Sequence, residues 1–532
     1  MRKIFNLIYN EKHFFTLATI FFIIGSFIFK DYGISWDEPN ERYSGFVSLN
    51  EVFRIFNIDS LNNYPELSNY IFREYGVLFN LPLAYIEILF NIDKSKSIYL
   101  LRHYINFLIF FIATIYFYFS LRIFYNKTIS IIGFIFLISS PRIFAESFYN
   151  NKDMIFFSLY VMTSYYFIKF YINKKLINII FFSLFAALSI NIRVLGLLPI
   201  FILVFFLFLD GLNRKEKLLL NSKYIILNII LVSIFVYLIW PFLWSNPLNN
   251  ILYTLKSMSS YDWPGLVFFL GEYHEGKKIP WNYSMVLFTI TTPLIIVILF
   301  LIGLANCFRQ LFINFLSLRE NEISNLWKND LQLFNTFSLF NILIILIFII
   351  EFESTLYGGW RHIYFLYPSI IVISLSSLSI VKKILNFKIM YSIIFFFLII
   401  NLKWLIQNHP YQFVYYNPLI KKYIKNNFEL DHWGVSNIHS INYLLNQYDK
   451  DEYLVFIYSN SPYYYSLNLL NKNEQEKIKF VKKIDDAEFI LTNHYYLNQD
   501  PKEMDQFLVN NYELEHEIIV NNVSINSIFK KK

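Results

Sequence analysis

Apolar residues recur in runs of roughly 20 along this chain, and short polar segments separate the runs. A helix of that length crosses the hydrocarbon core of a bilayer, so the pattern predicts a polytopic membrane protein. We expect about eleven spans, at residues 13–30, 98–121, 128–141, 153–172, 176–192, 194–210, 224–243, 284–306, 332–351, 361–381 and 388–405. A further apolar run, 76–91, contains Pro82 and Glu87, and we expect it to be juxtamembrane or re-entrant.

The distribution of charge orients these predicted helices. If the N-terminus is cytoplasmic, every short inner loop contains Lys or Arg, as the positive-inside rule requires. Counting 76–91 as a span would reverse the orientation of everything after it, so that interpretation is rejected. An odd number of spans then places the C-terminus on the periplasmic or extracellular side of a plasma membrane, most simply the inner membrane of a bacterium. The inner segments are 1–12, 122–127, 173–175, 211–223, 307–331 and 382–388.

Composition agrees with a membrane protein. The 532 residues are 56% hydrophobic and 16% charged, against about 45–50% and about 25% in soluble domains. The net charge of +7 is explained by the basic inner loops, so it does not indicate nucleic-acid binding. Cys307 is the only cysteine, which excludes an intramolecular disulfide and a cysteine-based metal cluster. The first apolar run has no small-residue cleavage site, and we interpret it as a retained helix.

The pattern changes near residue 406. Residues 406–532 are more polar and have no spanning run, with a helical pattern near 436–448 and strand-like stretches at 453–458 and 487–492. We therefore expect a mainly α membrane domain over 1–405 and a small soluble α/β domain over 406–532. The first outer loop of the membrane domain, 31–97, would contain juxtamembrane helices.

Two adjacent carboxylates, Asp37 and Glu38, follow the first predicted span directly. A carboxylate at the membrane surface can act as a general base and remove a proton from an acceptor hydroxyl or amine. The alternative is a solvated loop or a helix cap before Pro39.

A second group of ionisable residues joins two predicted spans. Charged groups that border the hydrocarbon are costly to bury and are usually functional or paired. The alternative is a polar hairpin with an internal Lys–Asp pair. The group consists of Arg142, Glu146, Lys152 and Asp153.

A third group is basic and lies at predicted outer helix ends, against the positive-inside trend. Anion binding would explain it, because a guanidinium bonds phosphate in a bidentate manner and histidine adds a donor. The alternatives are pairing between helices, with Glu351 or Glu353, and snorkelling. The residues are Arg102, His103, Arg193, Arg361 and His362.

Several short motifs together resemble a known family. In order and spacing, the chain over roughly 13–435 is similar to multi-spanning glycosyltransferases of the GT-C fold, in the group of dolichyl-phosphate-mannose–protein mannosyltransferases and bacterial aminoarabinose transferases. The motifs are Gly33-Ile-Ser-Trp-Asp-Glu-Pro39, Leu101-Arg-His103, Ser140-Pro-Arg142, Asn151-Lys-Asp153, Asn191-Ile-Arg-Val-Leu-Gly196, Trp240-Pro-Phe-Leu-Trp244, Ile279-Pro-Trp281, Gly359-Trp-Arg-His362, His409-Pro-Tyr-Gln-Phe-Val-Tyr-Tyr-Asn-Pro418 and Asp431-His-Trp-Gly434.

The resemblance implies a sugar donor linked to a polyprenyl phosphate, used at the non-cytoplasmic face on a glycan, lipid or protein acceptor. It implies that Asp37 is the base with Glu38 beside it, and that Asp153 is the second-loop acid with Glu146 assisting. Arg361 and His362 would hold the lipid phosphate. The second loop reads Asn-Lys-Asp in place of Asp-x-Asp, which argues against a required divalent metal, and no other cofactor is implied. One base and no partner nucleophile predict direct displacement with inversion.

Two other functions stay open at this stage. A transporter or flippase of lipid-linked glycans would also need basic and aromatic groups, but it should carry charges near the midplane and broken spans. A glycan polymerase or ligase would act on two lipid-linked sugars, and the sequence does not separate it from a transferase of single sugars.

Overall fold

The structure is a computed structural model that describes residues 8–58, 61, 63–211, 215–259, 261, 263–317, 327–495 and 501–532. It is mainly helical. The long helices share one continuous apolar core, and a smaller core lies beneath a C-terminal β-sheet.

Nine helical stretches in the described part of the chain are long and apolar enough to cross a bilayer. They are Lys12–Asp31, Ser95–Phe124, Asp153–Asn173, Val194–Gly211, Lys217–Ile239, Leu294–Leu316, Asp330–Glu351, Arg361–Ile384 and Phe387–Gln407. They contain the helices α2 (Lys12–Ile28), α5 (Ser95–Phe124), α8 (Asp153–Asn173), α10 (Leu198–Gly211), α11 (Lys215–Ile239), α14 (Leu294–Leu316), α15 (Asp330–Glu351), α16 (Tyr367–Ser376), α17 (Leu378–Ile384) and α18 (Phe387–Gln407).

Two further predicted spans have a different form. Helices α6 (Lys127–Ile138) and α7 (Pro141–Tyr149) meet at a bend of 62° and make a tenth span if counted together. Pro141 explains the break, since proline cannot continue the hydrogen bonding of the preceding helix. Helix α9 (Leu176–Ile192) has 17 residues and packs along α8 and α11. Counting both gives the number of spans predicted from the sequence.

One predicted span is misplaced. The run 284–306 is divided into α13 (Tyr283–Thr291) and α14, because the chain leaves the helical conformation at Thr292 and Pro293. Pro293 caps α14, so the apolar helix continues to Leu316. The span is therefore 294–316, and the nine residues of α13 lie before it.

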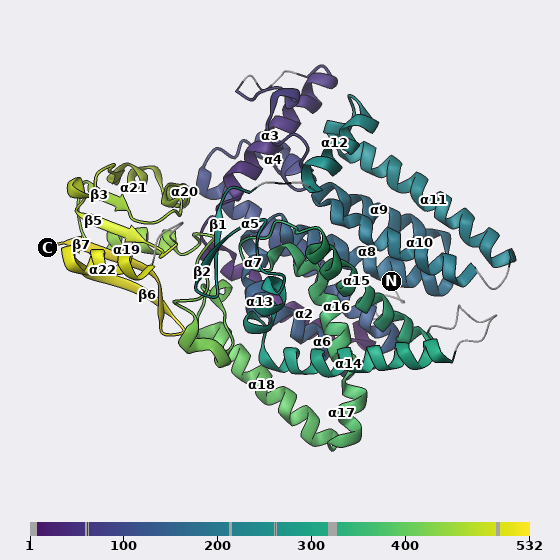
Figure 1. The fold of residues 1–532 in the computed structure, drawn as a ribbon. Coiled ribbons are helices and arrows are strands. Elements are labelled where there is room, and N and C mark those ends of the chain that lie inside the picture. The colour runs from purple at the N-terminus through teal and green to yellow at the C-terminus, as the bar shows by residue number, and fades with distance from the viewer. Residues whose placement is uncertain are drawn as a thin grey trace.

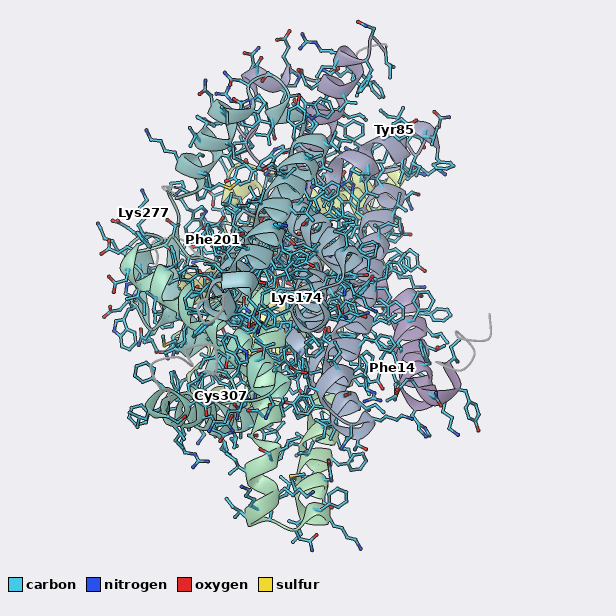
Figure 2. The ribbon with its side chains drawn as sticks, turned by 90° about the vertical axis from the view of Figure 1, so that its right-hand side faces the viewer. Phe14, Tyr85, Lys174, Phe201, Lys277 and Cys307 are labelled. Atoms are coloured by element: carbon cyan, nitrogen blue, oxygen red, sulfur yellow. The ribbon has the colours of Figure 1, made fainter. Side chains whose placement is uncertain are left out.

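Large apolar side chains cover the outside of the bundle. Phe201 on α10 is 65% exposed, and Figure 2 shows it on the face turned toward the viewer. Exposed apolar faces also run along α11, α14 and α18. A surface of this kind is stable against lipid but not against water, so the chain is an integral, multi-pass membrane protein.

Two helices lie between the first two spanning helices, α2 and α5. Helix α3 (Glu38–Ile55) packs on α4 (Asn80–Leu89), which corresponds to the apolar run at 76–91. Ten residues of helix extend about 15 Å, roughly half of the hydrocarbon thickness, so α4 is too short to span.

The C-terminal sheet has five strands in the order β4-β3-β5-β7-β6. Strand β3 (Tyr453–Ile457) is parallel to β4 (Ile478–Phe480) and β5 (Phe489–Thr492), whereas β7 (Val523–Lys531) is antiparallel to β5 and to β6 (Tyr512–Val520). Helices α19 (Asn437–Gln447), α20 (Tyr463–Ser466), α21 (Lys472–Lys477) and α22 (Pro501–Asn511) accompany it. The predicted fold class, a polytopic helical bundle with a small C-terminal α/β domain, is confirmed.

The hairpin of β6 and β7 was not predicted from the sequence. Its turn, Asn521 and Asn522, has φ of 55° and 65°, and asparagine tolerates this left-handed conformation in a tight hairpin turn. The Asn-Asn pair between two alternating apolar stretches was the available signal.

The C-terminal sheet occupies one end of the molecule (Figure 1). The start of α11 and the end of α14 lie at the opposite end. Two short β-strands, β1 (Leu266–Phe269) and β2 (Glu272–Glu275), form a hairpin near the sheet end. Ile34, which precedes α3, and Tyr99 of α5 join the core beneath the sheet, so the sheet is packed onto the membrane part.

We predict that the two ends of the molecule face opposite sides of the membrane. With the buried native Cys307 replaced by serine, a cysteine at the exposed Lys383 should react with an impermeant thiol reagent only from the cytoplasmic side. A cysteine at the exposed Lys472 should react only from the other side. Labelling of both from the same side would contradict this topology.

Candidate active site

Arg361 lies at the centre of a buried group of charged side chains. It begins the short helix η6 (Arg361–Leu366), which leads into α16, and its side chain is only 5% exposed. Its guanidinium carbon lies 4.7 Å from the ring centre of Tyr357 and 4.5 Å from that of Trp433. Two aromatic faces therefore hold the cation by cation–π contacts.

Two carboxylates bind the same nitrogen of Arg361. Arg361 Nη1 donates to Asp37 Oδ2 at 3.1 Å and to Asp153 Oδ2 at 3.3 Å. Arg193 donates to the remaining oxygen of Asp153, Oδ1. We call Asp37, Asp153, Arg193 and Arg361 the Arg361 cluster. All four are among the site residues predicted from the sequence, and the fold brings them together.

Every member of the Arg361 cluster stands at the end of a helix. Asp37 directly precedes α3, Asp153 is the first residue of α8, and Arg193 follows the last residue of α9. The helix dipole favours a carboxylate at an N-terminus, which stabilises Asp37 and Asp153 in their positions. Asp37 is 39% exposed and Asp153 only 2%, so Asp37 is the more accessible of the two carboxylates.

A polar turn before α8 fixes Asp153. The side chain of Asn150 accepts a bond from the Asp153 backbone N–H at 3.0 Å and donates to Asp153 Oδ2 at 3.2 Å. The same amide donates to Glu146 Oε2 at 2.7 Å, and Tyr364 donates to Glu146 Oε1 at 2.7 Å. Glu146 therefore ties this turn to η6, next to Arg361.

Glu38 lies beside the Arg361 cluster and has a different environment from Asp37. Its carboxylate is buried and accepts from the backbone N–H of Ser35 at 2.6 Å and from the Ser35 hydroxyl at 3.0 Å. Its other oxygen lies 2.8 Å from His103 Nε2. These bonds fix the loop that carries Asp37, so the geometry favours a positioning role for Glu38 and His103.

Arg102 is a predicted site residue whose partners lie outside the Arg361 cluster. It donates to Glu87 at 2.9 and 2.6 Å and to Asn80 at 2.8 Å, and its side chain is 1% exposed. These bonds hold the Arg102 side chain on α4, so the fold does not bring it into the Arg361 cluster. The pairing alternative describes it better, although the partner is Glu87 of α4 and not Glu351 or Glu353.

Two further predicted cations border the site. Arg142 Nε donates to the backbone oxygen of Tyr415 at 3.3 Å, and its guanidinium lies 4.9 Å from the Tyr416 ring. Lys152 lies 3.9 Å from Glu41 and 4.0 Å from the ring centre of Tyr75.

His362 follows Arg361 and packs on Tyr357, with ring centres 4.7 Å apart. Its Nδ1 is buried and has no hydrogen-bond partner in the described part of the chain.

Glu41 is a site residue that the sequence prediction missed. It lies one helical turn after Asp37 on α3, and its side chain is 15% exposed. Burial raises the pKa of Glu41 to about 7, and the Lys152 ammonium opposes that shift. The spacing of four residues from Asp37, after the helix-starting Pro39, was the signal that would have found it.

The C-terminal part of the chain supplies the other missed residues. His432, Trp433 and Glu429 all lie close to Arg361, and the Asp431-His-Trp-Gly434 motif had suggested a resemblance without suggesting a role. No pattern in the sequence indicated that this segment folds back over the start of η6.

The structure gives no positive indication of a metal site. Within the described ranges, no three His, Cys, Asp or Glu side chains are grouped so that they would hold an ion. The carboxylates of Asp37 and Asp153 are both bound by the guanidinium of Arg361.

Comparison with known proteins supports the resemblance. A family model described as dolichyl-phosphate-mannose-protein mannosyltransferase matches residues 83–240, which include Asp153 and Arg193. Over these residues the chain is similar to that family, as predicted from the motifs. No curated protein matches the sequence.

Two solved structures are similar to this chain at low sequence identity. ArnT from Cupriavidus metallidurans in the apo state matches at 9% identity and a TM-score of 0.46, covering 97% of this chain and 96% of that chain. The Archaeoglobus fulgidus oligosaccharyltransferase in the apo form matches at 11% identity and a TM-score of 0.43, covering 90% and 69%.

We predict that ionisation of Glu429 lowers stability at neutral pH. Burial raises the pKa of Glu429 to about 7 from its ordinary 4.5, against the opposing effects of the Phe268 N–H, Arg142 and Arg361. The unfolded chain releases this proton first, so the free energy of unfolding falls as pH rises from about 4.5 to about 7. Glu429→Gln keeps an acceptor for Phe268 and cannot ionise.

The melting temperature of Glu429→Gln relative to the unaltered protein should therefore be higher at pH 8 than at pH 5. Thermal unfolding in detergent at the two pH values measures it. If the difference in melting temperature between Glu429→Gln and the unaltered protein is the same at both pH values, Glu429 does not titrate in this range.

Proposed function

We propose that the protein is a glycosyltransferase that moves a sugar from a polyprenyl-phosphate donor to an acceptor at the non-cytoplasmic face of the membrane. The observation that carries this proposal is the Arg361 cluster. It combines a buried guanidinium whose Nε has no partner among the described residues with a partly exposed carboxylate bound to that guanidinium. The similarity of residues 83–240 to the mannosyltransferase family supports the same class of reaction.

The chemistry requires little beyond these groups. A sugar phosphate is already activated, so the enzyme must hold the phosphate, position the acceptor and accept one proton. Arg361 would bind the phosphate. It would also stabilise the negative charge that the phosphate gains when the polyprenyl phosphate departs as the leaving group. Asp153 and Arg193 would keep Arg361 oriented, because Asp153 is buried and bonded to both arginines.

The reaction would be one displacement. The acceptor oxygen or nitrogen forms a bond to the anomeric carbon while the bond from that carbon to the phosphate oxygen breaks. The acceptor proton goes to Asp37, and the polyprenyl phosphate leaves with the electron pair of the broken bond. A single displacement inverts the anomeric configuration, as in inverting glycosidases.

The position of the charges argues against a transporter. Asp37, Asp153, Arg193 and Arg361 all stand at helix ends, whereas a transporter needs its binding groups near the middle of the membrane. A polymerase or ligase would use the same site on a second lipid-linked sugar, so it is a special case of this proposal.

We predict that Arg361 sets the affinity for the lipid phosphate. Arg361→Lys should weaken binding of a polyprenyl phosphate by about 10- to 100-fold, since lysine keeps the charge but loses the planar fork and the aromatic stacking. Arg102→Lys is the matched control, because Arg102 is also buried but is bonded to Glu87 and Asn80.

The affinity for the polyprenyl phosphate is measured by titrating this lipid into the purified protein in detergent micelles. Arg102→Lys should bind like the unaltered protein. Equal affinity of Arg361→Lys and the unaltered protein would assign Arg361 a structural role only.

We predict that Asp37 is the proton acceptor. Asp37→Asn keeps the shape and one acceptor oxygen for Arg361, but it cannot accept the proton near neutral pH. Turnover should fall by about 10²–10⁴-fold while donor binding is retained. Glu38→Gln should cost less turnover than Asp37→Asn, since Glu38 is bonded to Ser35 and His103. Near-normal turnover of Asp37→Asn would remove Asp37 from this role and direct attention to Glu38 or Asp153.

A further inference from the structure

Besides His362 Nδ1, three buried nitrogen atoms of Arg361 and of the segment that packs on it have no hydrogen-bond partner among the described residues. They are Arg361 Nε, His432 Nε2 and Trp433 Nε1. A buried polar atom without a partner costs roughly 1–3 kcal/mol, so proteins rarely contain several together without a reason. Their grouping at one place points to a bound group that accepts hydrogen bonds.

Arg361 Nε and His432 Nε2 both lie next to Gly358. A β-carbon built at Gly358 would lie 3.0 Å from Arg361 Nε and 3.1 Å from His432 Nε2. Gly358 has a φ of 63°, which suits glycine and leaves this position free of a side chain. The ring of Trp433 packs on the guanidinium of Arg361, so the indole N–H of Trp433 also lies close to Arg361.

The segment that carries His432 and Trp433 is held firmly. The side chain of Asp431 accepts from the backbone N–H groups of Val435 and Ser436 at 3.2 and 2.8 Å. Asn493, which follows strand β5, donates to the backbone oxygen of Asp431 at 2.8 Å. On the other side, the backbone N–H of Trp36 donates to the Trp433 oxygen at 3.2 Å. The unpartnered nitrogens are therefore fixed in place on both sides.

The electrostatics favour a neutral histidine as donor. Burial, together with the positive charges of Arg361 and Arg142, holds the pKa of His432 well below its usual range. A neutral imidazole that carries its hydrogen on Nε2 donates one hydrogen bond without adding a charge. It would complement Arg361, which supplies the charge.

We propose that His432 and Trp433 bind the phosphate group of the polyprenyl-phosphate donor together with Arg361. This inference rests on the proposed function and extends it. The lipid phosphate would be held on one side by the membrane bundle and on the other by a segment that continues into the C-terminal domain. The C-terminal domain is then part of the donor site and not a separate module.

The experiment measures the affinity of the full-length protein in detergent for a polyprenyl phosphate, with the uncharged polyprenol as a second ligand. His432→Phe keeps a planar ring and removes the donor, so it should weaken phosphate binding by about tenfold. His432→Gln should recover part of the loss because its amide donates. Trp433→Phe keeps the ring on Arg361 and should also weaken binding, and it carries the test alone if His432→Phe does not fold.

Binding of the polyprenol should be the same in all these variants. The matched control is His439→Gln, since His439 is bonded to the backbone oxygen of Asp31. It should bind the polyprenyl phosphate like the unaltered protein.

The outcomes separate the two proposals. Normal phosphate binding by His432→Phe and Trp433→Phe, with weakened binding by Arg361→Lys, would overturn this inference and leave the proposed function standing. Normal binding by all three variants would overturn both. Displacement of the lipid by millimolar inorganic phosphate would assign these donors to a free phosphate and overturn the lipid assignment.

Discussion

The ion pairs of Arg361 determine how the site is assembled. One nitrogen atom bonds two carboxylates that lie 324 and 208 residues away along the chain. Removing water from three charged groups is costly unless they are paired, so the start of η6, the start of α3 and the start of α8 must come together. The polar turn at Asn150 fixes the position of Asp153. The bonds of Glu38 to Ser35 and His103 fix the loop that carries Asp37.

Comparison of Arg102 with Arg361 shows what the sequence could predict and what it could not. Both are arginines at predicted outer helix ends, each followed by histidine, and the sequence treats them alike. In the structure the donors of Arg102 are used by Glu87 and Asn80, whereas Arg361 Nε has no partner among the described residues. The difference comes from α4, which packs on α3 and brings Glu87 and Asn80 within hydrogen-bond distance of Arg102. That packing depends on tertiary contacts that no local pattern contains.

The spans were predictable for the opposite reason. Hydropathy reports a local requirement, namely that each helix must bury its backbone polar groups and match the bilayer by itself. The prediction of a span fails where the helix is interrupted. At Pro293 a new helix begins, so the span extends from residue 294 to Leu316 and not from residue 284 to 306. Asp37, Asp153 and Arg361 were predicted because charges are rare in such a sequence, but their meeting was not. Glu41 and His432 were missed because each looks like an ordinary polar residue in a polar segment.

Stability alone does not account for the Arg361 cluster. Buried ion pairs contribute little net free energy, and replacing them with well-packed apolar residues is often neutral or stabilising. A cluster kept only for stability would also use its donors fully, as Arg102 does. Arg361 instead bonds both acids through Nη1, stacks on Tyr357 and Trp433, and leaves Nε unused within the described structure. A guanidinium that is held rigidly and yet incompletely bonded can take a further acceptor, which the proposed anion binding requires independently of any family resemblance.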